Sequence, residues 1–529
     1  MVHKKLQVWF PLLFAIVMIL GMFIGFQLRE KTAGATTFLI NSNKNPLDEI
    51  ISLIQSKYVD NIKTDSLDNL VVDDVLGHLD PHSVYIPAKD LQGVTEDLQG
   101  NFQGIGVEFQ IFNDTVNIMN VIADGPSFKA GVQVGDKIIR VNDTANIAHA
   151  GIAPDDVRKL LRGPAGTDVT ITLLRDNQQK KITIKRGTIP LLSVDAAYLI
   201  LPQTGYIRIN KFSETTYEEF MRAMESLKQK GMKKLILDLR GNGGGFMNEA
   251  VDIADEFLDA DKMIVYTLGS KVSKAEYRCK RNGLFESGKL AVLVDETSAS
   301  ASEILSGALQ DWDRATIIGR RTFGKGLVQQ QFRLSDGSAL RLTIARYYTP
   351  LGRNIQKPYN KGREQYEEEL IERFHDGEVV TGDTSTPAGK VYTTPGGRKV
   401  YGGGGITPDV FVPFDTTSQP QEVIDLYVKN ILNNFVYRNY IQNKKYFNAF
   451  KTPQELYIQF HPGESEWKQL VSFAGKDSVD ISKVSLTAKA DLLKKIQALT
   501  ARQIWRTEGF YEISNPDDPI VKRALEAVK

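Results

Sequence analysis

The feature that most constrains this chain is a strand-to-helix turn rich in serine. An apolar run at 291–294 is short enough to form a buried strand. Apolar residues then recur at helical spacing over 304–312, so a helix begins just before this segment. Three serines occupy the turn: Ser298, Ser300 and Ser302. Backbone N–H groups at a helix N-terminus favour negative charge, so a serine here can cap the helix or act as a nucleophile. These residues alone do not distinguish the two roles or the three serines.

A second segment, 321–330, carries a lysine between two glycines. Lys325 follows Gly324 and precedes Gly326, where the backbone can approach another segment closely. A strand of period 2 would place Lys325 and Gln329 on one face. Serine with lysine is a known nucleophile–base pair, and the lysine must be neutral to act. Its pKa must fall from about 10.4 to near 7, which burial without a carboxylate partner can supply. A glutamine can orient the amine without adding charge.

Seven short motifs run along the chain in a fixed order. They read LDPHSVYIP at 79–87, GIGVEF at 104–109, LDLRGNGGG at 237–245, SASASEI at 298–304, TFGKGLVQQ at 322–330, TPLGRNIQ at 349–356 and GITPDV at 405–410. In this order and spacing, from about residue 46 to 415, they resemble the carboxy-terminal processing peptidases, also called tail-specific proteases. The resemblance implies a serine endopeptidase that needs no metal or other cofactor. It implies an α/β multidomain fold with an N-terminal helical segment, a PDZ β-barrel-like domain, an α/β protease core of the ClpP/crotonase-like βαβ type and a helical C-terminal domain.

The resemblance also assigns catalytic roles by position. It implies that Ser300 is the nucleophile, Lys325 the general base and Gln329 the partner that orients the base. Asp311 matches an aspartate that is often discussed beside this pair. We expect a structural role for Asp311, because a close carboxylate would keep the lysine charged.

A glycine-rich loop at 240–245 follows a buried strand. The segments before it predict a strand, an amphipathic helix and a second strand in a βαβ-like order: Gly205–Asn210, Tyr217–Lys230 and Leu235–Leu239. A phosphate cradle is the rival interpretation of such a loop, but no lysine of the Walker pattern follows it. The resemblance implies instead that the loop supplies an oxyanion donor, the amide of Gly245, with the amide of Ala301 as its partner. Such donors are worth roughly 3–4 kcal/mol each.

Residues 101–188 have the order of a PDZ domain, with a glycine loop at 104–109 and a helix start at Pro154. A peptide tail would add to a strand edge and place its carboxylate on backbone amides of that loop. The expected contacts are the amides of Ile105, Gly106 and Val107, and the side chains of Val157, Leu160 and Leu161. A small barrel that uses these glycines only for turns is the alternative, and the resemblance favours tail binding.

The N-terminal segment 1–35 predicts a membrane anchor or signal segment with a tether. Val8–Phe26 is an uncharged run near the length that spans a bilayer, and the preceding Lys4 and Lys5 favour a cytoplasmic N-terminus. A cleaved signal peptide is the alternative, because 33–35 reads Ala-Gly-Ala. We expect a single-pass protein of the inner membrane with its catalytic part on the periplasmic side.

The helical segments expected at the two ends of the folded chain, 46–100 and 416–529, predict packing and no chemistry of their own. We expect helices at 46–100, a core at 189–415 with a solvated excursion at 357–399, and a helical domain at 416–529. In the family the first of these helps protomers associate, so a homodimer is one arrangement that the resemblance allows. The formal charge of +1 does not indicate nucleic-acid binding. We interpret the histidines at 78 and 82 as surface or capping residues and Cys279 as a buried small hydrophobe.

The sequence therefore predicts a membrane-tethered endopeptidase that binds the C-termini of exported proteins and processes or degrades them. Two functions of other classes compete with this one. The first is a catalytically idle PDZ scaffold that binds protein C-termini, against which the intact serine, lysine and glutamine argue. The second is a fold relative that uses its loop amides on thioesters or retinoid-like ligands, against which the PDZ segment argues.

Overall fold

The computed structural model describes residues 64–143, 145–382, 389–415 and 420–529, together with residues 18 and 50. Several predicted features lie outside the described residues: the anchor at 8–26, the alternative cleavage site, the tether and most of the helical segment expected at 46–63. Within the described ranges, no helix is both long and apolar enough to cross a bilayer.

The N-terminal segment contains a strand as well as helices: α3 (Thr64–Gly77), β1 (Val84–Ile86) and α4 (Ala88–Gln99). The expectation of helices alone is therefore wrong at β1, which pairs antiparallel with a strand of the protease core. The apolar side chains of this segment are not all buried, since Val75 is 56% exposed and Leu79 is 53% exposed. Leu79 lies beyond the end of α3 at Gly77, so helical spacing no longer governs its direction.

A six-stranded sheet forms the centre of the protease core. Its order is β10 (Val194–Leu201), β11 (Thr204–Ile209), β12 (Lys234–Asp238), β15 (Leu290–Val294), β16 (Thr316–Gly319) and β21 (Val410–Phe411). Strand β10 runs antiparallel to β11, and the other neighbours are parallel. The predicted βαβ arrangement around 205–239 is present.

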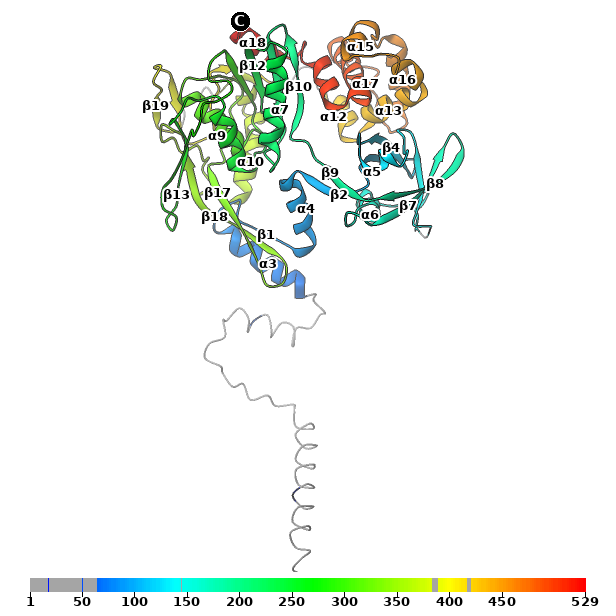
Figure 1. Cartoon of the computed structure of the whole chain (residues 1–529), viewed down its shortest axis with the longest axis horizontal. Coiled ribbons are helices and arrows are strands. Elements are labelled where there is room, and N and C mark those ends of the chain that lie inside the picture. The colour runs from blue at the N-terminus through cyan, green and yellow to red at the C-terminus, as the bar shows by residue number, and fades with distance from the viewer. Residues whose placement is uncertain (1–17, 19–49, 51–63, 144, 383–388, 416–419) are drawn as a thin grey trace, which may run out of the picture. The chain divides into compact units, whose positions relative to one another are not determined.

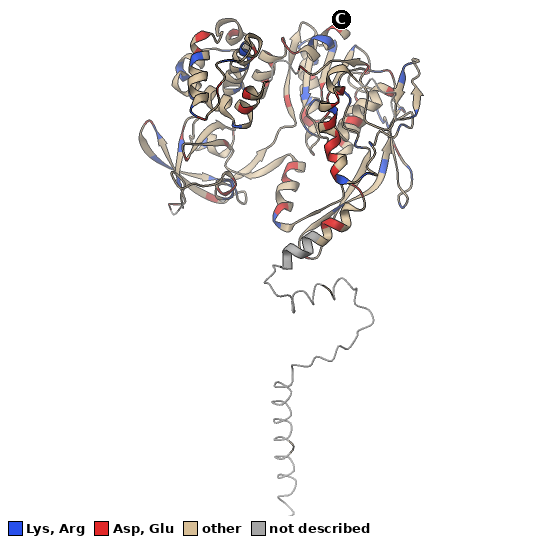
Figure 2. Cartoon of the chain, turned by 180° about the vertical axis from the view of Figure 1, so that it is seen from behind, with Lys and Arg blue, Asp and Glu red and all other residues tan. Residues whose placement is uncertain are grey.

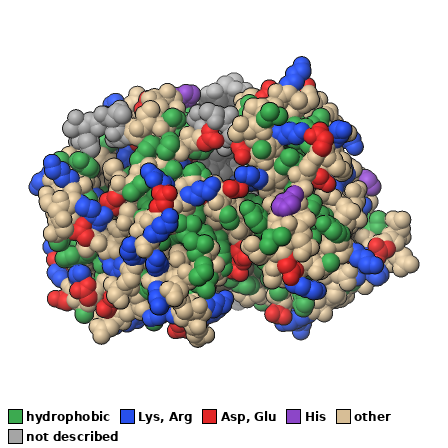
Figure 3. Space-filling view, turned by 90° about the horizontal axis from the view of Figure 1, so that it is seen from above, with side chains coloured by type: hydrophobic (Ala, Val, Ile, Leu, Met, Phe, Trp, Pro, Cys, Tyr) green, Lys and Arg blue, Asp and Glu red, His purple; other side chains and the backbone are tan. Residues whose placement is uncertain are grey.

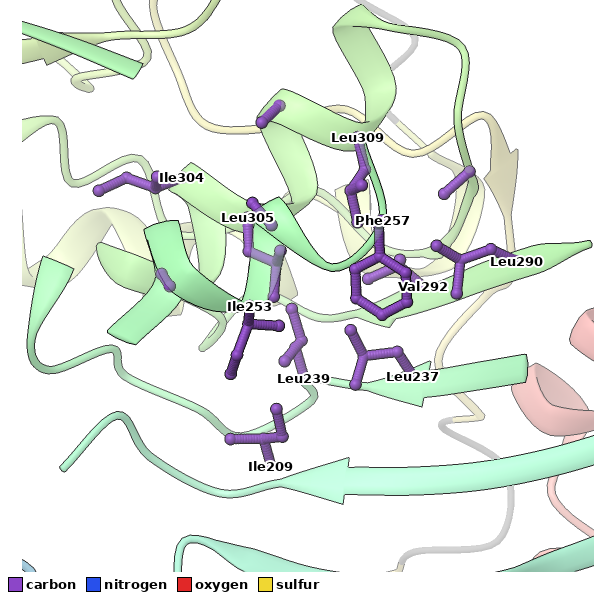
Figure 4. Close-up of a cluster of buried hydrophobic side chains, with 14 of the residues drawn as sticks. Ile209, Leu237, Leu239, Ile253, Phe257, Leu290, Val292, Ile304, Leu305 and Leu309 are labelled. Atoms are coloured by element: carbon purple, nitrogen blue, oxygen red, sulfur yellow. The ribbon is translucent and has the colours of Figure 1, made fainter. Parts of the chain in front are cut away.

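Helices cover both faces of this sheet. On one face lie α7 (Thr216–Gln229), α8 (Met247–Asp255) and α9 (Ala301–Asp311). Figure 4 shows Leu237, Leu239 and Val292 from the sheet beside Phe257 and Leu305 from the helical layer. On the other face, Ile236, Ala291, Leu293 and Ile318 pack with apolar residues of α18 (Pro519–Ala527). The sheet is thus buried on both sides, as parallel sheets require.

A second sheet lies in the same core and carries the lysine segment. Its order is β1, β18 (Ala339–Tyr348), β13 (Met263–Leu268) and β14 (Ala275–Arg278), and β17 (Leu327–Arg333) also pairs with β18. Strand β17 begins two residues after Lys325, and its pairing with β18 shifts register between Val328 and Gln329. Lys325 therefore lies before the strand, and simple strand alternation does not describe its relation to Gln329.

The PDZ segment forms a sheet of β3 (Val107–Phe112), β4 (Thr115–Val121), β5 (Lys137–Val141), β7 (Asp168–Arg175) and β8 (Gln178–Lys185), with the short β6 (Ala145–Asn146) on β5. Two helices complete it, α5 (Pro126–Lys129) and α6 (Pro154–Leu161). At its base, β2 (Asn101–Gly104) pairs with β9 (Gly187–Pro190). The segment is thereby closed at the point where the chain enters and leaves it.

The segment 357–399 is not the solvated excursion that we expected. It contains α10 (Arg363–His375), α11 (Glu378–Thr381), β19 (Val391–Thr393) and, from Lys399, β20 (Lys399–Tyr401). On α10, Tyr366 is 4% exposed and Arg373 is 2% exposed. The charged composition concealed this, because only two residues of the helix point inward.

The C-terminal segment is helical, as expected, with α12 (Gln421–Val428), α13 (Ile431–Gln442), α14 (Lys444–Phe447), α15 (Pro453–Gln459), α16 (Glu464–Gly475), α17 (Leu486–Ser514) and α18. Figure 1 shows α13, α15, α16 and α17 gathered in one group. Its aromatic side chains fill two buried clusters, whereas α18 packs on the core sheet.

Across the part of the chain that the structure describes, acidic and basic residues are interspersed, as on the face in Figure 3. Figure 2 shows the same mixing along the ribbon.

Candidate active site

Two loops meet at the carboxyl ends of neighbouring parallel strands, β12 and β15. The Ala299 amide donates to the Asn242 carbonyl at 3.0 Å, and the Gly241 amide donates to the Asp295 carboxylate at 3.1 Å. The carboxyl edge of a parallel sheet is the usual place for a site in this architecture, because adjacent loops converge there. The glycine loop and the serine turn, predicted separately, are thus brought together.

The structure separates the three serines of this turn. Ser298 Oγ donates to the Leu239 carbonyl at 2.9 Å, and Ser302 Oγ donates to the Asn242 carbonyl at 2.9 Å. Both side chains are fully buried, whereas Ser300 is partly exposed. Ser300 has φ 56° and ψ −113° at the N-terminus of α9, a strained conformation for any residue but glycine. Only Ser300 of the three therefore combines access with strain, which often marks functional residues.

Lys325 has a neutral partner. Its Nζ donates to Gln329 Oε1 at 2.9 Å, and among the described residues no carboxylate lies within 4.0 Å of this nitrogen. Burial lowers the pKa of Lys325 to about 8, and the Arg341 guanidinium adds to the effect, against the carboxylates of Glu303 and Asp80. The predicted shift toward neutrality is present in direction, and the contact between Lys325 and Gln329 forms as expected.

One buried carboxylate, that of Glu303, holds the serine turn and the lysine segment together. It accepts hydrogen bonds from the Ser300 amide at 2.9 Å, the Gly324 amide at 2.8 Å, the Lys325 amide at 2.8 Å and the Thr322 hydroxyl at 2.5 Å. Burial raises the pKa of Glu303 to about 7, although these four hydrogen bonds oppose the rise. Sequence reasoning took this residue only as the start of a helix.

A tyrosine makes the same connection from another side. Tyr347 on β18 donates its hydroxyl to the Ser300 carbonyl at 3.1 Å and also to the Lys325 carbonyl. Its side chain is buried. The backbones of nucleophile and base candidates are therefore joined by two separate side chains, those of Glu303 and Tyr347. The sequence separation of Glu303 and Tyr347 from Lys325 does not predict these contacts.

The turn at 80–83 supplies the next contact. Gln329 Nε2 donates to the His82 carbonyl at 2.5 Å, so the amide oxygen of Gln329 faces Lys325. Asp80 stabilises this turn by accepting from the His82 amide at 2.9 Å and the Ser83 hydroxyl at 2.6 Å. Burial lowers the pKa of the His82 imidazole to about 4, and the charge of Lys325 adds to the effect. The surface interpretation is right for His78, which is exposed, and wrong for His82.

The glycine loop packs against Ser300 at the N-terminus of α9. Gly244 packs so closely that a Cβ there would lie 2.7 Å from the Ser300 Cβ. Gly245 has φ 144°, and a Cβ there would lie 2.1 Å from the Phe212 carbonyl oxygen. In the described part of the chain, neither the Gly245 amide nor the Ala301 amide donates to a protein acceptor. A backbone amide without a protein acceptor is what an oxyanion donor requires.

Asp311 is not a partner of the Lys325 amine. Its carboxylate pairs with Arg353 at 2.6 Å and accepts from the Leu351 amide at 2.9 Å, and both charged side chains are fully buried. This pairing agrees with the structural role expected for Asp311.

Cys279 is buried, as expected, and is free of any disulfide. Within the described ranges, no three His, Cys, Asp or Glu side chains are grouped to hold a metal ion.

The PDZ domain has a groove of about 440 Å³ between β3 and α6. Ile105, Gly106 and Val107 line it, as expected. The expected side chains are wrong in part: of the three named on α6, only Leu161 lines the groove, together with Pro154, Arg158 and Arg162. Val157 instead points into the domain core, because the face of α6 toward the groove is shifted by one residue from the apolar stripe.

Comparison with known proteins agrees with this architecture. The model of peptidase family S41 matches residues 203–362, a PDZ-domain model matches residues 103–185, and a model of a family of unknown function matches residues 423–506. A PDZ domain beside an S41 core defines a serine-type peptidase. A probable CtpA-like serine protease of Staphylococcus epidermidis (strain ATCC 12228 / FDA PCI 1200) is 34% identical over 367 residues, which are 67% of this chain and 72% of that protein.

Other relatives have the same description. A probable CtpA-like serine protease of Staphylococcus aureus (strain N315) is 35% identical over 317 residues, 59% of this chain and 63% of that protein. The solved photosystem II D1 C-terminal processing protease is 26% identical and matches 70% of this chain and 88% of its own, with a TM-score of 0.35. The chain belongs to the carboxy-terminal processing peptidases of family S41, so the resemblance carried by its motifs is confirmed, as is the multidomain α/β fold.

Proposed function

We propose that this peptidase cleaves with a Ser300–Lys325 dyad after capturing a protein C-terminus in its PDZ groove. One observation carries the catalytic part: the buried amine of Lys325 is hydrogen-bonded to a neutral amide at 2.9 Å, with its pKa lowered to about 8. A lysine held in this way can lose its proton near neutral pH, whereas a surface lysine cannot.

The reaction begins when Lys325 accepts the proton of Ser300 and Ser300 Oγ attacks the peptide carbonyl carbon. The amides of Gly245 and Ala301 then donate to the oxygen that becomes negative, and α9 adds its positive end. Lys325 returns the proton to the leaving nitrogen as the C–N bond breaks, which leaves an acyl-enzyme on Ser300. Water, deprotonated by Lys325, attacks the ester carbon, and Lys325 returns that proton to Ser300 Oγ as the ester bond breaks and the new C-terminus is released. Gln329 keeps the amine directed throughout.

The PDZ groove supports the recognition step. An extended tail can pair with the β3 edge, while amides of the loop before β3 receive its carboxylate. Arg158 and Arg162 also line the groove, where they pair with Asp155 and Glu96. We therefore propose that substrates are proteins with a free, apolar C-terminus and that the tail is bound while an upstream bond is cut.

The membrane anchor supports the choice of substrates. The uncharged run 8–26 behind two lysines is long enough to place the rest of the chain outside the cytoplasm. We propose a single-pass protein of the inner membrane that processes or degrades exported proteins on the periplasmic side. Fractionation tests this part: the full chain should sediment with membranes and be digested by protease added to spheroplasts. Full protection of the catalytic part would contradict it.

The catalytic and recognition steps are tested together. We would give an unfolded protein with an apolar tail to the full chain, to Ser300→Ala and to Lys325→Ala, each in mild detergent. We expect fragments from the wild type only, and loss of cleavage when the tail is amidated. Cleavage by Ser300→Ala would disprove the nucleophile, and equal cleavage of amidated substrate would disprove tail recognition. A fluorophosphonate that labels no form at position 300 would favour the idle scaffold.

A further inference from the structure

Helix α10 is anchored on the backbone that leads to Lys325. The Arg373 guanidinium donates to three successive carbonyls, those of Arg321 at 3.2 Å, Thr322 at 2.9 Å and Phe323 at 3.2 Å. Its Nε also pairs with Glu369 at 2.8 Å, one turn earlier on the same helix. A buried arginine that satisfies three consecutive carbonyls fixes the path of that segment, because each unsatisfied carbonyl would be costly.

The same helix reaches Gln329 by another route. His82 Nε2 and the Tyr366 hydroxyl are 2.8 Å apart, and the two rings are in edge contact with centroids 5.3 Å apart. His82 is the residue whose carbonyl accepts from the Gln329 amide at 2.5 Å. Tyr366 therefore fixes the turn that orients Gln329. One helix thus contacts both supports of the Lys325–Gln329 pair.

A buried lysine fills the space between these two contacts. Lys357 Nζ lies 4.1 Å from the centre of the Phe323 ring and 4.2 Å from that of Tyr366. It also pairs with Glu369 at 2.8 Å, and Glu369 in turn pairs with Arg373. Glu369 thus pairs with both of these buried cations, and the linked interactions hold α10 against the core.

We propose that α10 belongs to the catalytic machinery, with Arg373 and Tyr366 as positioning residues that fix Lys325 and Gln329 relative to each other. This inference rests on the dyad proposed above. Lys325 lies between two glycines, which give the backbone little conformational restriction of its own. The contacts of α10 explain how the lysine amine nevertheless keeps one position. The match to family S41 ends at residue 362, immediately before α10, so the helix is an addition to the part of the core that the family model covers.

The test measures phosphonylation of Ser300 by a fluorophosphonate, which releases fluoride, from pH 6 to 10 on the full chain. Arg373→Met and Tyr366→Phe are compared with Arg373→Lys, which restores a positive charge, and with Arg363→Met, which removes an exposed arginine from the same helix. Thermal unfolding identifies the variants that fold. We expect Arg373→Met to label at least about 10-fold more slowly and Tyr366→Phe several-fold more slowly, because small misplacements of catalytic groups cost up to about 100-fold.

The acidic limb of the pH profile distinguishes positioning from mere stability. A loosened segment admits water to the amine, so both variants should move this limb to higher pH, by about one unit. Arg373→Lys should recover part of the rate, and Arg363→Met should match the wild type. Folded variants with the wild-type limb would overturn the inference, whether or not their unfolding temperature falls, and Tyr366→Phe decides if Arg373→Met does not fold. A wild type that is not labelled at Ser300 would overturn the dyad itself.

Discussion

Gln329 donates its side-chain amide to the main-chain carbonyl of His82 at 2.5 Å, which joins strand β17 to a turn far earlier in the chain. Because the nitrogen of the amide is occupied there, its oxygen is left to face Lys325 at 2.9 Å. The His82 carbonyl thus orients the Gln329 amide, and the amide oxygen orients the Lys325 amine, so no charged side chain is needed for this contact. This arrangement leads to several measurable consequences.

The first concerns pH. Lys325 acts as a base only when neutral, and burial lowers its pKa to about 8. Below that pH the amine is protonated, so kcat/KM should fall about tenfold for each pH unit, and above it the rate should level off. Steady-state cleavage between pH 6 and 10 measures this limb. A rate that is constant between pH 6 and 8 would exclude Lys325 as the titrating base.

The second changes the partner of the lysine. Gln329→Glu replaces a neutral amide by a carboxylate beside Lys325, and an opposite charge at this distance raises a lysine pKa by about 1–3 units. We expect the acidic limb to move up by that amount and activity at pH 7.5 to fall accordingly. Gln329→Ala, which adds no charge, is the control for lost orientation. An unmoved limb in Gln329→Glu would show that the carboxylate does not reach the amine.

The third uses the three serines. Ser298→Ala and Ser302→Ala each remove one hydrogen bond to a buried carbonyl that keeps a backbone donor, so each should lower the free energy of unfolding by about 0.5–1.5 kcal/mol. The folded fraction of both variants should still react at the wild-type rate. Ser300→Ala should abolish the reaction with little loss of stability. Denaturant unfolding and fluorophosphonate labelling make these measurements, and loss of labelling in Ser298→Ala at wild-type stability would count against the assignment.

The fourth uses two glycines of one loop. Gly245→Ala places a Cβ 2.1 Å from the Phe212 carbonyl oxygen, so the loop must move and its amide leaves the site. We expect kcat to fall about 10²–10³-fold, the usual effect of losing one oxyanion donor. Gly243→Ala is the matched control, because a Cβ there meets nothing within 4 Å. Equal activity of the two variants would exclude this amide from the oxyanion site.

The fifth separates stability from chemistry at Asp311. Asp311→Asn breaks a fully buried ion pair with Arg353, which should cost about 3–5 kcal/mol of unfolding free energy. Folded Asp311→Asn protein should keep the wild-type pH profile, since Asp311 makes no contact with Lys325. Urea unfolding and the pH–rate profile test the two statements. A shifted acidic limb would place Asp311 in the electrostatics of the base.

Much of this site followed from local sequence. Strand β15, the turn and helix α9 lie close to where apolar spacing put them, and the family motifs singled out Ser300. What local reasoning missed depends on contacts between distant segments. Local sequence indicated only that Glu303 begins a helix, whereas three of its four hydrogen bonds come from a distant segment, at Thr322, Gly324 and Lys325.

The errors in the helices have a related cause. In the C-terminal segment, apolar residues at helical spacing run through 424–435, but α12 and α13 are separated at Asn430, which has φ 55°, and Val428 is 79% exposed. In α10 the burial was underestimated. Its many charged residues predicted a solvent-exposed helix, whereas Arg373 and Tyr366 are buried. Periodicity describes one helix at a time and carries no information about which neighbour covers it.

Helix α18 has a consequence for how the molecule is made. It closes one face of the central sheet with Ile520, Val521 and Ala524, yet it follows Ser300 by most of the second half of the chain. A ribosome therefore exposes the nucleophile segment well before it has synthesised the cover for strands β15 and β16. Until that helix arrives, apolar residues of the sheet face water, and a chain shortened before residue 519 should aggregate. The core sheet can therefore complete its folding only after α18 has been synthesised, which is later than the synthesis of Ser300 and Lys325.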